Sequence, residues 1–206
     1  MLTIWGRANS VNVQKVLWTC DELQIAYERI DAGRGFSDTN TQEYRRLNPN
    51  GLIPTLVDGD FILWESNVIV RYLAAPYGDA QFYPADLHSR FLCEQWMDWN
   101  ATTLWPAVRP IFQLLVRTTP DKRDLSPLGT LQSQADATMR ILDEQLRERE
   151  FVGGKSFTMA DIPVGVSAHR WFNLEIERSE LPALRRWYED INKRPAFRSH
   201  VTKPLT

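Results

Sequence analysis

Residues 48–66 read Asn-Pro-Asn-Gly-Leu-Ile-Pro-Thr-Leu-Val-Asp-Gly-Asp-Phe-Ile-Leu-Trp-Glu-Ser, and this stretch decides the fold of the first half of the chain. Two short runs, Thr55–Val57 and Phe61–Trp64, have the composition of β-strands. Between them stands Asp58-Gly59, a dipeptide that readily adopts the positive φ angles of a two-residue hairpin turn. The stretch therefore predicts an antiparallel strand pair, followed by a helix that begins near Ser66.

The residues before and after this hairpin alternate between strand-like and helical patterns. Leu2–Trp5 and Tyr27–Ile30 are short strand candidates, and a polar helical stretch runs from Thr39 to Leu47. The helix after Ser66 should stop near Pro76. Between the first two strands, apolar residues recur at helical spacing: Val13, Val16, Leu17, Cys20 and Leu23. The predicted order is β-α-β-α-β-β-α.

Strand-like patterns disappear beyond the loop between Pro76 and Pro84, and long helical patterns replace them. One such pattern runs from Leu87 to Val116. Pro106 and Pro110 should kink or break its second half, because proline has no N–H to donate and crowds the preceding turn. We therefore predict an α/β plus all-α architecture, with one domain over residues 1–77 and an all-helical domain over residues 84–206.

Local signals mark the starts of two later helices. Ser126-Pro127 combines an N-cap residue with a proline suited to the first turn. Thr158 and Asp161 form a variant capping box, in which Asp stands in place of Glu. Pro163 follows two residues later and should cost that helix one hydrogen bond, which predicts a local kink.

The composition excludes several classes of function. A formal net charge of −2 gives no general attraction for nucleic acid or for an anionic membrane, so we expect neither as a partner. Cys20 and Cys93 are isolated in the sequence, which argues against a disulfide framework and against a metal site. The sequence shows no signal-like segment and no run of about 18 apolar residues, so we expect a cytoplasmic protein.

Ser10 and Asn12 stand where the first strand passes into the first helix. One or both can simply cap that helix. Alternatively, the Ser10 hydroxyl can donate a hydrogen bond to an anion that the helix dipole and free backbone N–H groups already favour. Position alone leaves both interpretations open.

Two further places in residues 48–66 carry candidate chemistry. Pro54 is either an ordinary residue at the start of a strand or follows a cis bond that turns the Ile53 backbone outward, ready to pair with an extended peptide. Glu65 and Ser66 are either a solvated acid and an N-cap or a site for a zwitterion, with the acid on an amine and the helix N-terminus on a carboxylate. The second interpretation matches the head group of an amino acid.

Together these motifs resemble those of a bacterial soluble glutathione S-transferase of the serine/asparagine type, theta-like or beta-like. The resemblance rests on the segments around Ser10, Ile53-Pro54 and Glu65-Ser66, and on residues 151–162 with their capping motif. It implies a thioredoxin-like domain that binds glutathione, a helical bundle domain that holds the second substrate, and a homodimer. No metal cofactor is implied.

The resemblance also assigns roles to residues. Glu65 and Ser66 would hold the γ-glutamyl group of glutathione, Ile53 before a cis Pro54 would pair with the cysteinyl backbone, and Ser10 would face the sulfur. No tyrosine of the animal classes is present near the N-terminus, and Ser10 replaces the cysteine of the beta class. Asn12 is the alternative donor to the thiolate, since related bacterial members use an Asn there.

The implied reaction is conjugation of glutathione to a small hydrophobic electrophile. Thr103, Trp105 and Arg109 are the candidates for lining the electrophile pocket, although such aromatic residues more often belong to a core. Other chemistry on the same site is also open: peroxide or disulfide reduction, dehalogenation or isomerisation. A non-catalytic binding or scaffold protein on the same fold is the remaining alternative.

Overall fold

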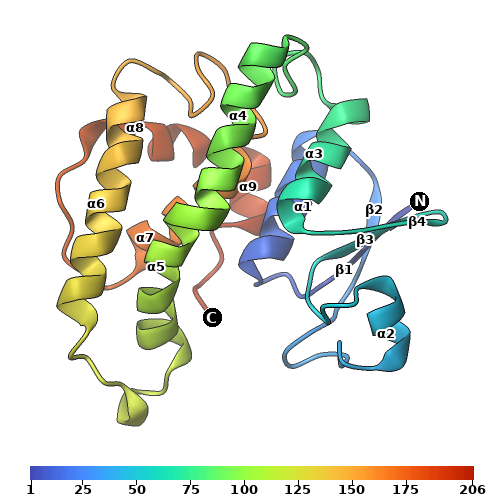
Figure 1. The fold of residues 1–206 in the computed structure, drawn as a ribbon, viewed down its shortest axis with the longest axis horizontal. Coiled ribbons are helices and arrows are strands. Elements are labelled where there is room, and N and C mark those ends of the chain that lie inside the picture. Colours follow the sequence, from blue (N-terminus) through green and yellow to red (C-terminus); the bar gives the residue numbers. More distant parts are fainter.

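A computed structural model describes residues 1–206. The first half of the chain follows the predicted order of strands and helices (Figure 1). Its elements are β1 (Leu2–Trp5), α1 (Val11–Glu22), β2 (Tyr27–Ile30), α2 (Gln42–Leu47), β3 (Thr55–Asp58), β4 (Phe61–Trp64) and α3 (Ser66–Tyr77). The predicted thioredoxin-like pattern is confirmed.

The four strands form one mixed sheet in the order β2-β1-β3-β4. β1 runs parallel to β2 and antiparallel to β3, and β3 and β4 form the predicted hairpin. The predicted turn is one residue out of place, because Asp58 pairs with Phe61 and the two turn residues are Gly59 and Asp60. Only Gly59 has a positive φ, 59°, which is the pattern of a type II′ turn with glycine first.

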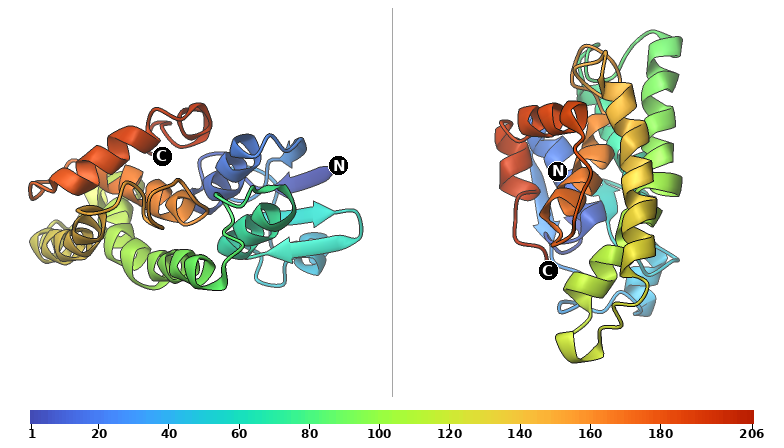
Figure 2. Two further views of the ribbon diagram at one scale, coloured as in Figure 1. Left: turned by 90° about the horizontal axis from the view of Figure 1, so that it is seen from above. Right: turned by 90° about the vertical axis from the view of Figure 1, so that its left-hand side faces the viewer.

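Helix α1 lies between the sheet and the helical half of the chain. Its apolar face joins a cluster of 10 buried residues that includes Ile4 of β1 and Leu56 of β3. Trp18, on another face of the same helix, belongs instead to the larger cluster of 33 buried residues. α1 therefore contributes to both cores and lies between the two halves of the chain (Figure 2, left).

The second half of the chain is all-helical, as predicted. Its elements are α4 (Leu87–Trp99), η1 (Asn100–Leu104), α5 (Trp105–Phe112), η2 (Gln113–Arg117), the short η3 (Pro120–Lys122), α6 (Leu128–Leu146), α7 (Asp161–Asn173), α8 (Pro182–Ile191) and α9 (Pro195–His200). The predicted boundary falls in the connection between α3 and α4. The division into two domains at that point stays a prediction.

The break that Pro106 and Pro110 predict in the α4–α5 region does not occur. The chain stays helical from Leu87 to Arg117, but wide π-type turns replace the regular pattern in η1, directly before α5, and again in η2. Pro106 has no N–H for the carbonyl four residues earlier, which lies in η1, so the helix changes its register there instead of breaking.

Two predictions about helix starts are wrong. Ser126 does not cap α6: that helix begins after Pro127 without a side-chain cap, and the Ser126 N–H donates to the Asp124 carboxylate at 2.9 Å. Pro163 costs no helix hydrogen bond, because α7 begins at Asp161. The N–H groups of a helix's first turn have no partner within the helix, so a proline there removes nothing.

Asp161 holds the start of α7 in place, as the capping motif predicts. Its fully buried carboxylate accepts hydrogen bonds from the Thr158 N–H, the Val152 N–H and the Trp187 indole N–H, at 2.9, 2.9 and 2.8 Å. Burial raises the pKa of this carboxyl to about 6, and the hydrogen bonds oppose that rise. Asp161 therefore joins α7, α8 and the preceding loop.

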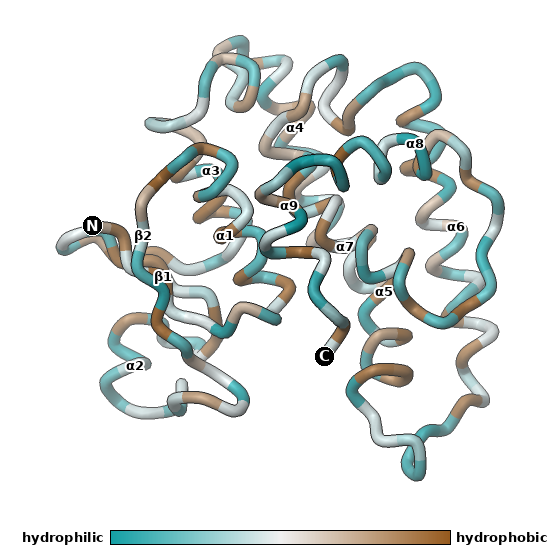
Figure 3. The backbone as a smooth tube through the Cα atoms, turned by 180° about the vertical axis from the view of Figure 1, so that it is seen from behind, coloured by the Kyte–Doolittle hydropathy of each residue, from teal (hydrophilic) through white to brown (hydrophobic).

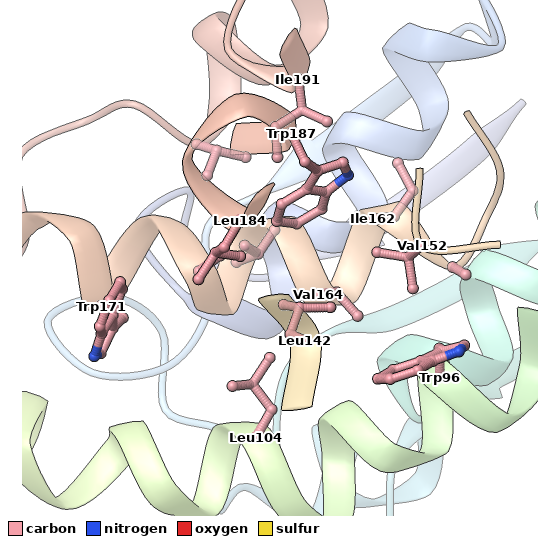
Figure 4. Close-up of a cluster of buried hydrophobic side chains, with 14 of the residues drawn as sticks. Trp96, Leu104, Leu142, Val152, Ile162, Val164, Trp171, Leu184, Trp187 and Ile191 are labelled. Carbon is pink, nitrogen blue, oxygen red and sulfur yellow. The ribbon is translucent and has the colours of Figure 1, made fainter. Parts of the chain in front are cut away.

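The larger core fills the space between α4, α6, α7 and α8. Figure 4 shows Leu142 of α6 beside Val164 of α7, with Leu184 and Trp187 of α8 above them. Hydrophobic and hydrophilic stretches alternate along these helices in Figure 3, as expected for helices with one buried face. No helix combines the length and the apolar character needed to span a membrane, and both cysteines are free and buried.

Candidate functional site

A cavity of about 490 Å³ lies where the loop before α1 faces α5 and η2. Its volume is within the usual range for a small-molecule site. The lining residues come from both halves of the chain: Arg7, Ser10, Val11, Asn12, Arg34, Leu52, Ile53, Trp105, Arg109, Phe112, Gln113 and Arg117. The cavity thus brings together five of the residues singled out in the sequence: Ser10, Asn12, Ile53, Trp105 and Arg109.

Ser10 occupies the N-cap position of α1, but its side chain makes no capping hydrogen bond. The capping interpretation is therefore wrong for this hydroxyl. Although the residue is only 9% exposed, it lines the cavity, and its hydroxyl forms no hydrogen bond within the chain. Ser10 presents a free donor at the positive end of a 12-residue helix, where an anion is stabilised.

Asn12 is exposed at the same end of α1. Its Oδ1 accepts a hydrogen bond from Lys15 Nζ at 3.1 Å, which leaves the amide NH₂ without a partner in the chain. An amide N–H in this position can also donate to an anion in the cavity. The two candidate donors therefore stand together, and the geometry does not separate them.

The Ile53–Pro54 peptide bond is cis, as the resemblance implies. The Ile53 N–H and C=O form no hydrogen bond within the chain, whereas the preceding Leu52 C=O accepts two, from the Tyr44 hydroxyl and the Asn48 side chain, both at 2.8 Å. The loop is thus held from behind while the Ile53 backbone stays free beside the cavity. An extended peptide can pair with such a segment by strand addition.

Glu65 and Ser66 lie at the N-terminus of α3, outside the lining of the cavity. Glu65 has φ 73° and ψ 106°, an uncommon conformation for a residue other than glycine. Its carboxylate is exposed and forms no ion pair, and Ser66 is buried directly behind it. The free Glu65 carboxylate therefore lies next to the N-terminus of α3. A zwitterion needs this arrangement, because the carboxylate can pair with its amine and the helix N-terminus with its carboxylate.

Lys15 links the start of α1 to the start of α3, and the sequence patterns did not single it out. This buried lysine donates to Asn12 Oδ1 at 3.1 Å, and to Ser66 Oγ and Asn67 Oδ1, both at 3.4 Å, without forming an ion pair. Burial lowers the pKa of Lys15 to about 8, and Glu65 partly opposes that effect. No local signal marks Lys15, because it is not among the residues of the predicted apolar face of α1 and its partners Ser66 and Asn67 belong to α3.

Only two of the three candidates for the electrophile pocket reach the cavity. Trp105 and Arg109 line the cavity, but Thr103 does not. Three further lining arginines, Arg7, Arg34 and Arg117, were missed. No local signal marks them, because they come from segments far apart in the chain. No group of three or more His, Cys, Asp or Glu side chains is placed to hold a metal ion.

Two family models match this chain. The model of the glutathione S-transferase N-terminal domain matches residues 1–75, and the model of the C-terminal domain matches residues 106–190. The chain belongs to the glutathione S-transferase family. The predicted fold, a thioredoxin-like domain followed by a helical bundle, is the fold of this family.

Relatives of the full length support this assignment. Glutathione S-transferase GstB of Escherichia coli K12 is 41% identical over 100% of both chains. Glutathione S-transferase D7 of Drosophila melanogaster is 34% identical over 83% of this chain and 74% of its own length. The theta class glutathione S-transferase of Xanthomonas axonopodis pv. citri, solved with glutathione bound, has 43% identity and a TM-score of 0.95 over 100% of this chain and 99% of its own.

Proposed function

We propose that this chain is a glutathione transferase that holds the sulfur of glutathione as a thiolate beside Ser10 and transfers it to an electrophilic carbon. In that step the S–C bond forms, the leaving group departs with its bonding electron pair, and the thiol proton has already passed to solvent. The observation that carries the proposal is the free Ser10 hydroxyl at the start of α1, in one cavity with the unpaired Ile53 backbone.

Glutathione fits between the two polar sites described above. We place its γ-glutamyl amine on Glu65 and its γ-glutamyl carboxylate at the start of α3 beside Ser66, with Lys15 behind that serine. The cysteinyl backbone then pairs with Ile53, next to Pro54. This placement directs the sulfur toward Ser10 and Asn12, because they line the same cavity as Ile53.

The site has enough stabilising interactions to ionise the thiol. A free thiol has a pKa of about 8.5, and lowering it to about 6.5 requires about 2.7 kcal/mol of preference for the anion. One charge-assisted hydrogen bond from Ser10 contributes roughly 1.5 to 3 kcal/mol, and the dipole of α1 about 0.3 to 1 kcal/mol. The serine acts as a hydrogen-bond donor and not as a nucleophile, so no base beside it is needed.

We assign the donor role to Ser10 ahead of Asn12, because Ser10 is the more buried of the two. The test compares Ser10→Ala with Ser10→Thr, which keeps the hydroxyl, and with Asn12→Ala. Ser10→Ala should raise the pKa of bound glutathione by about 1 to 2 units, measured by thiolate absorbance, and Ser10→Thr should raise it less. An unchanged thiol pKa in Ser10→Ala, or a larger rise in Asn12→Ala than in Ser10→Ala, would show that the assignment is wrong.

The alternatives share this glutathione site and differ in the second reactant. A panel of electrophiles, peroxides and mixed disulfides distinguishes conjugation from reduction. Retention on immobilised glutathione tests the non-catalytic alternative, because a folded protein that neither binds glutathione nor turns over any of the panel would be a scaffold.

We also propose that the protein is a homodimer. Exposed apolar side chains gather on β4, α3 and α4: Trp64, Val68, Leu87, Phe91 and Leu92. These elements lie side by side, since Arg71 of α3 pairs with Glu94 and Asp98 of α4. Exposed apolar side chains on neighbouring elements typically mark an interface.

Light scattering tests the dimer, with Phe91→Asp as the variant and Leu125→Asp as its control. Phe91 is 61% exposed on α4, and Leu125 is 53% exposed in the loop before α6. The Phe91 variant should become monomeric and the Leu125 variant should remain dimeric. A wild-type monomer would refute the proposal. A cytoplasmic location is consistent with the two free cysteines and is tested by cell fractionation.

A further inference from the structure

Four arginines line the cavity: Arg7, Arg34, Arg109 and Arg117. No Asp or Glu is among the lining residues. None of the four guanidinium groups forms an ion pair or donates a hydrogen bond within the chain, whereas other arginines do, such as Arg71 with Asp98 and Arg194 with Glu22. The cavity therefore concentrates uncompensated positive charge.

This concentration does not follow from the overall charge of the chain. Acidic residues outnumber basic ones, 26 to 24. Three of the four groups also lie close enough to repel one another, since the pKa of Arg117 is lowered by burial and by the charges of Arg7 and Arg34. Keeping such a cluster together costs stability, which a bound anion would recover.

A fifth arginine adds to the positive field behind the cavity. Arg170 of α7 is 3% exposed, and its Nε and Nη1 have no hydrogen-bond partner. Its single side-chain hydrogen bond is to Gln14 Oε1, at 2.5 Å. Burial, and to a smaller extent the charge of Arg117, lower its pKa to about 10. No carboxylate of the protein neutralises this group.

The carboxylates of glutathione can neutralise only part of the positive charge of these arginines. Its γ-glutamyl carboxylate belongs at α3 in the placement above, which leaves one glycyl carboxylate for the cavity. Arg7 stands on the glutathione side: its Nη1 is 3.3 Å from the position that a Cβ on Gly33 would occupy, and Ile53 packs against that same position. Arg109 and Arg117 come from α5 and η2. A single glycyl carboxylate cannot neutralise these two arginines as well as Arg7 and Arg34.

Two aromatic residues of α5 line the cavity: Trp105, which is half-buried, and Phe112, which is 3% exposed and belongs to the larger core. Trp105 and Phe112 lie with ring centroids 6.2 Å apart, and the Arg117 guanidinium stands over the Phe112 ring at 5.4 Å. A ligand beside α5 and η2 meets the Trp105 ring and cationic groups together. An uncharged hydrophobic molecule would satisfy only the rings.

We propose that the second substrate is an amphipathic anion, an electrophile with an apolar body and a carboxylate or similar acidic group, held by Arg109 and Arg117 against Trp105 and Phe112. The proposal rests on the proposed transferase function and narrows the expected hydrophobic electrophile to a charged class. In the reaction, the thiolate sulfur bonds to the electrophilic carbon, the leaving group takes the electron pair of its bond, and the acidic group of the substrate stays unchanged.

The test uses two electrophiles that differ only in charge: the chlorodinitrobenzoate whose carboxylate lies para to the chloride, and the corresponding neutral benzamide. Both react by displacement of chloride. The wild-type enzyme should favour the benzoate by about tenfold in kcat/KM, after correction for the uncatalysed rates, and added salt should reduce that preference. Equal kcat/KM for the two compounds would overturn the proposal. If the enzyme conjugated neither compound and no other electrophile, the transferase function itself would be refuted.

Variants of Arg109 and Arg117 test whether these two residues cause the preference for the benzoate. Arg109→Gln combined with Arg117→Gln should bring the two substrates to about equal kcat/KM while leaving the KM for glutathione unchanged. Arg147→Gln is the matched control, since Arg147 lies at the end of α6, outside the cavity. Arg117→Lys keeps the charge and should retain most of the preference. A raised KM for glutathione with an unchanged preference would assign the two arginines to the glycyl carboxylate and refute the proposal.

Discussion

Lys15 should make the stability of this protein rise with pH in a range where most proteins weaken. Its side chain is buried without an ion pair, and its pKa falls from 10.5 to about 8 on folding. Because the unfolded chain binds this proton more strongly, the free energy of unfolding increases as pH rises through 8 toward 10.5. At 1.36 kcal/mol per unit, the gain between pH 7 and pH 9.5 is about 2 kcal/mol.

The assay is urea denaturation of the wild type and of Lys15→Met across this pH range. The difference in unfolding free energy between the two proteins should change by about 2 kcal/mol, which removes the contribution of all other titrating groups. Lys155→Met, a change at an exposed loop lysine, should show a constant difference from the wild type. A constant difference for Lys15→Met as well would refute the reasoning.

Glutathione offers a second test of Lys15, made on the wild-type protein. A carboxylate bound beside Ser66 would favour the charged form of Lys15, so saturating glutathione should reduce the pH dependence of the wild-type stability. If glutathione leaves the pH dependence unchanged, its carboxylate does not bind beside this lysine.

Three further predictions concern single residues. Asp161→Ala should lower the free energy of unfolding by about 4 kcal/mol, because three buried N–H donors lose their acceptor; a loss below about 1 kcal/mol in urea would contradict this. His169 is buried and its pKa falls to about 4, so the unfolded chain takes up the proton first, and the stability difference between the wild type and His169→Gln should fall by about 3 kcal/mol between pH 6.5 and pH 4. His169→Gln should show a smaller loss in acid denaturation, and an equal loss would point to other groups. Glu65→Gln should weaken glutathione binding by about tenfold in calorimetry, and unchanged affinity would remove Glu65 from the amine site.

Local patterns predicted the elements well because their signals lie within one turn or one strand. The spacing of Val13, Val16 and Leu17 identified the buried face of α1, and these three side chains are fully or almost fully buried. The errors are local too. The turn moved by one residue because only Gly59 needed a positive φ, and Ser126 lost the capping role when Asp124 accepted its N–H.

The candidate site was predictable where a residue's position in its own element decides its chemistry. Ser10 at the start of a helix and Ile53 before a proline are such cases, and both line the cavity. Whether the Ser10 hydroxyl capped its helix was undecidable from the sequence, since a serine at that position can turn either way.

The sequence by itself determined the order of strands and helices and the glutathione motifs, because hydrophobic spacing and turn chemistry act between near neighbours. Only the tertiary structure decided which charges meet. Lys15 contacts Ser66 across 51 positions of sequence, and Arg7 comes to share a cavity with Arg117 of η2. Electrostatic interactions depend on the distance between charges in space, and the packing of α1 against both cores sets that distance. The proposed preference for an anionic substrate depends on the same packing.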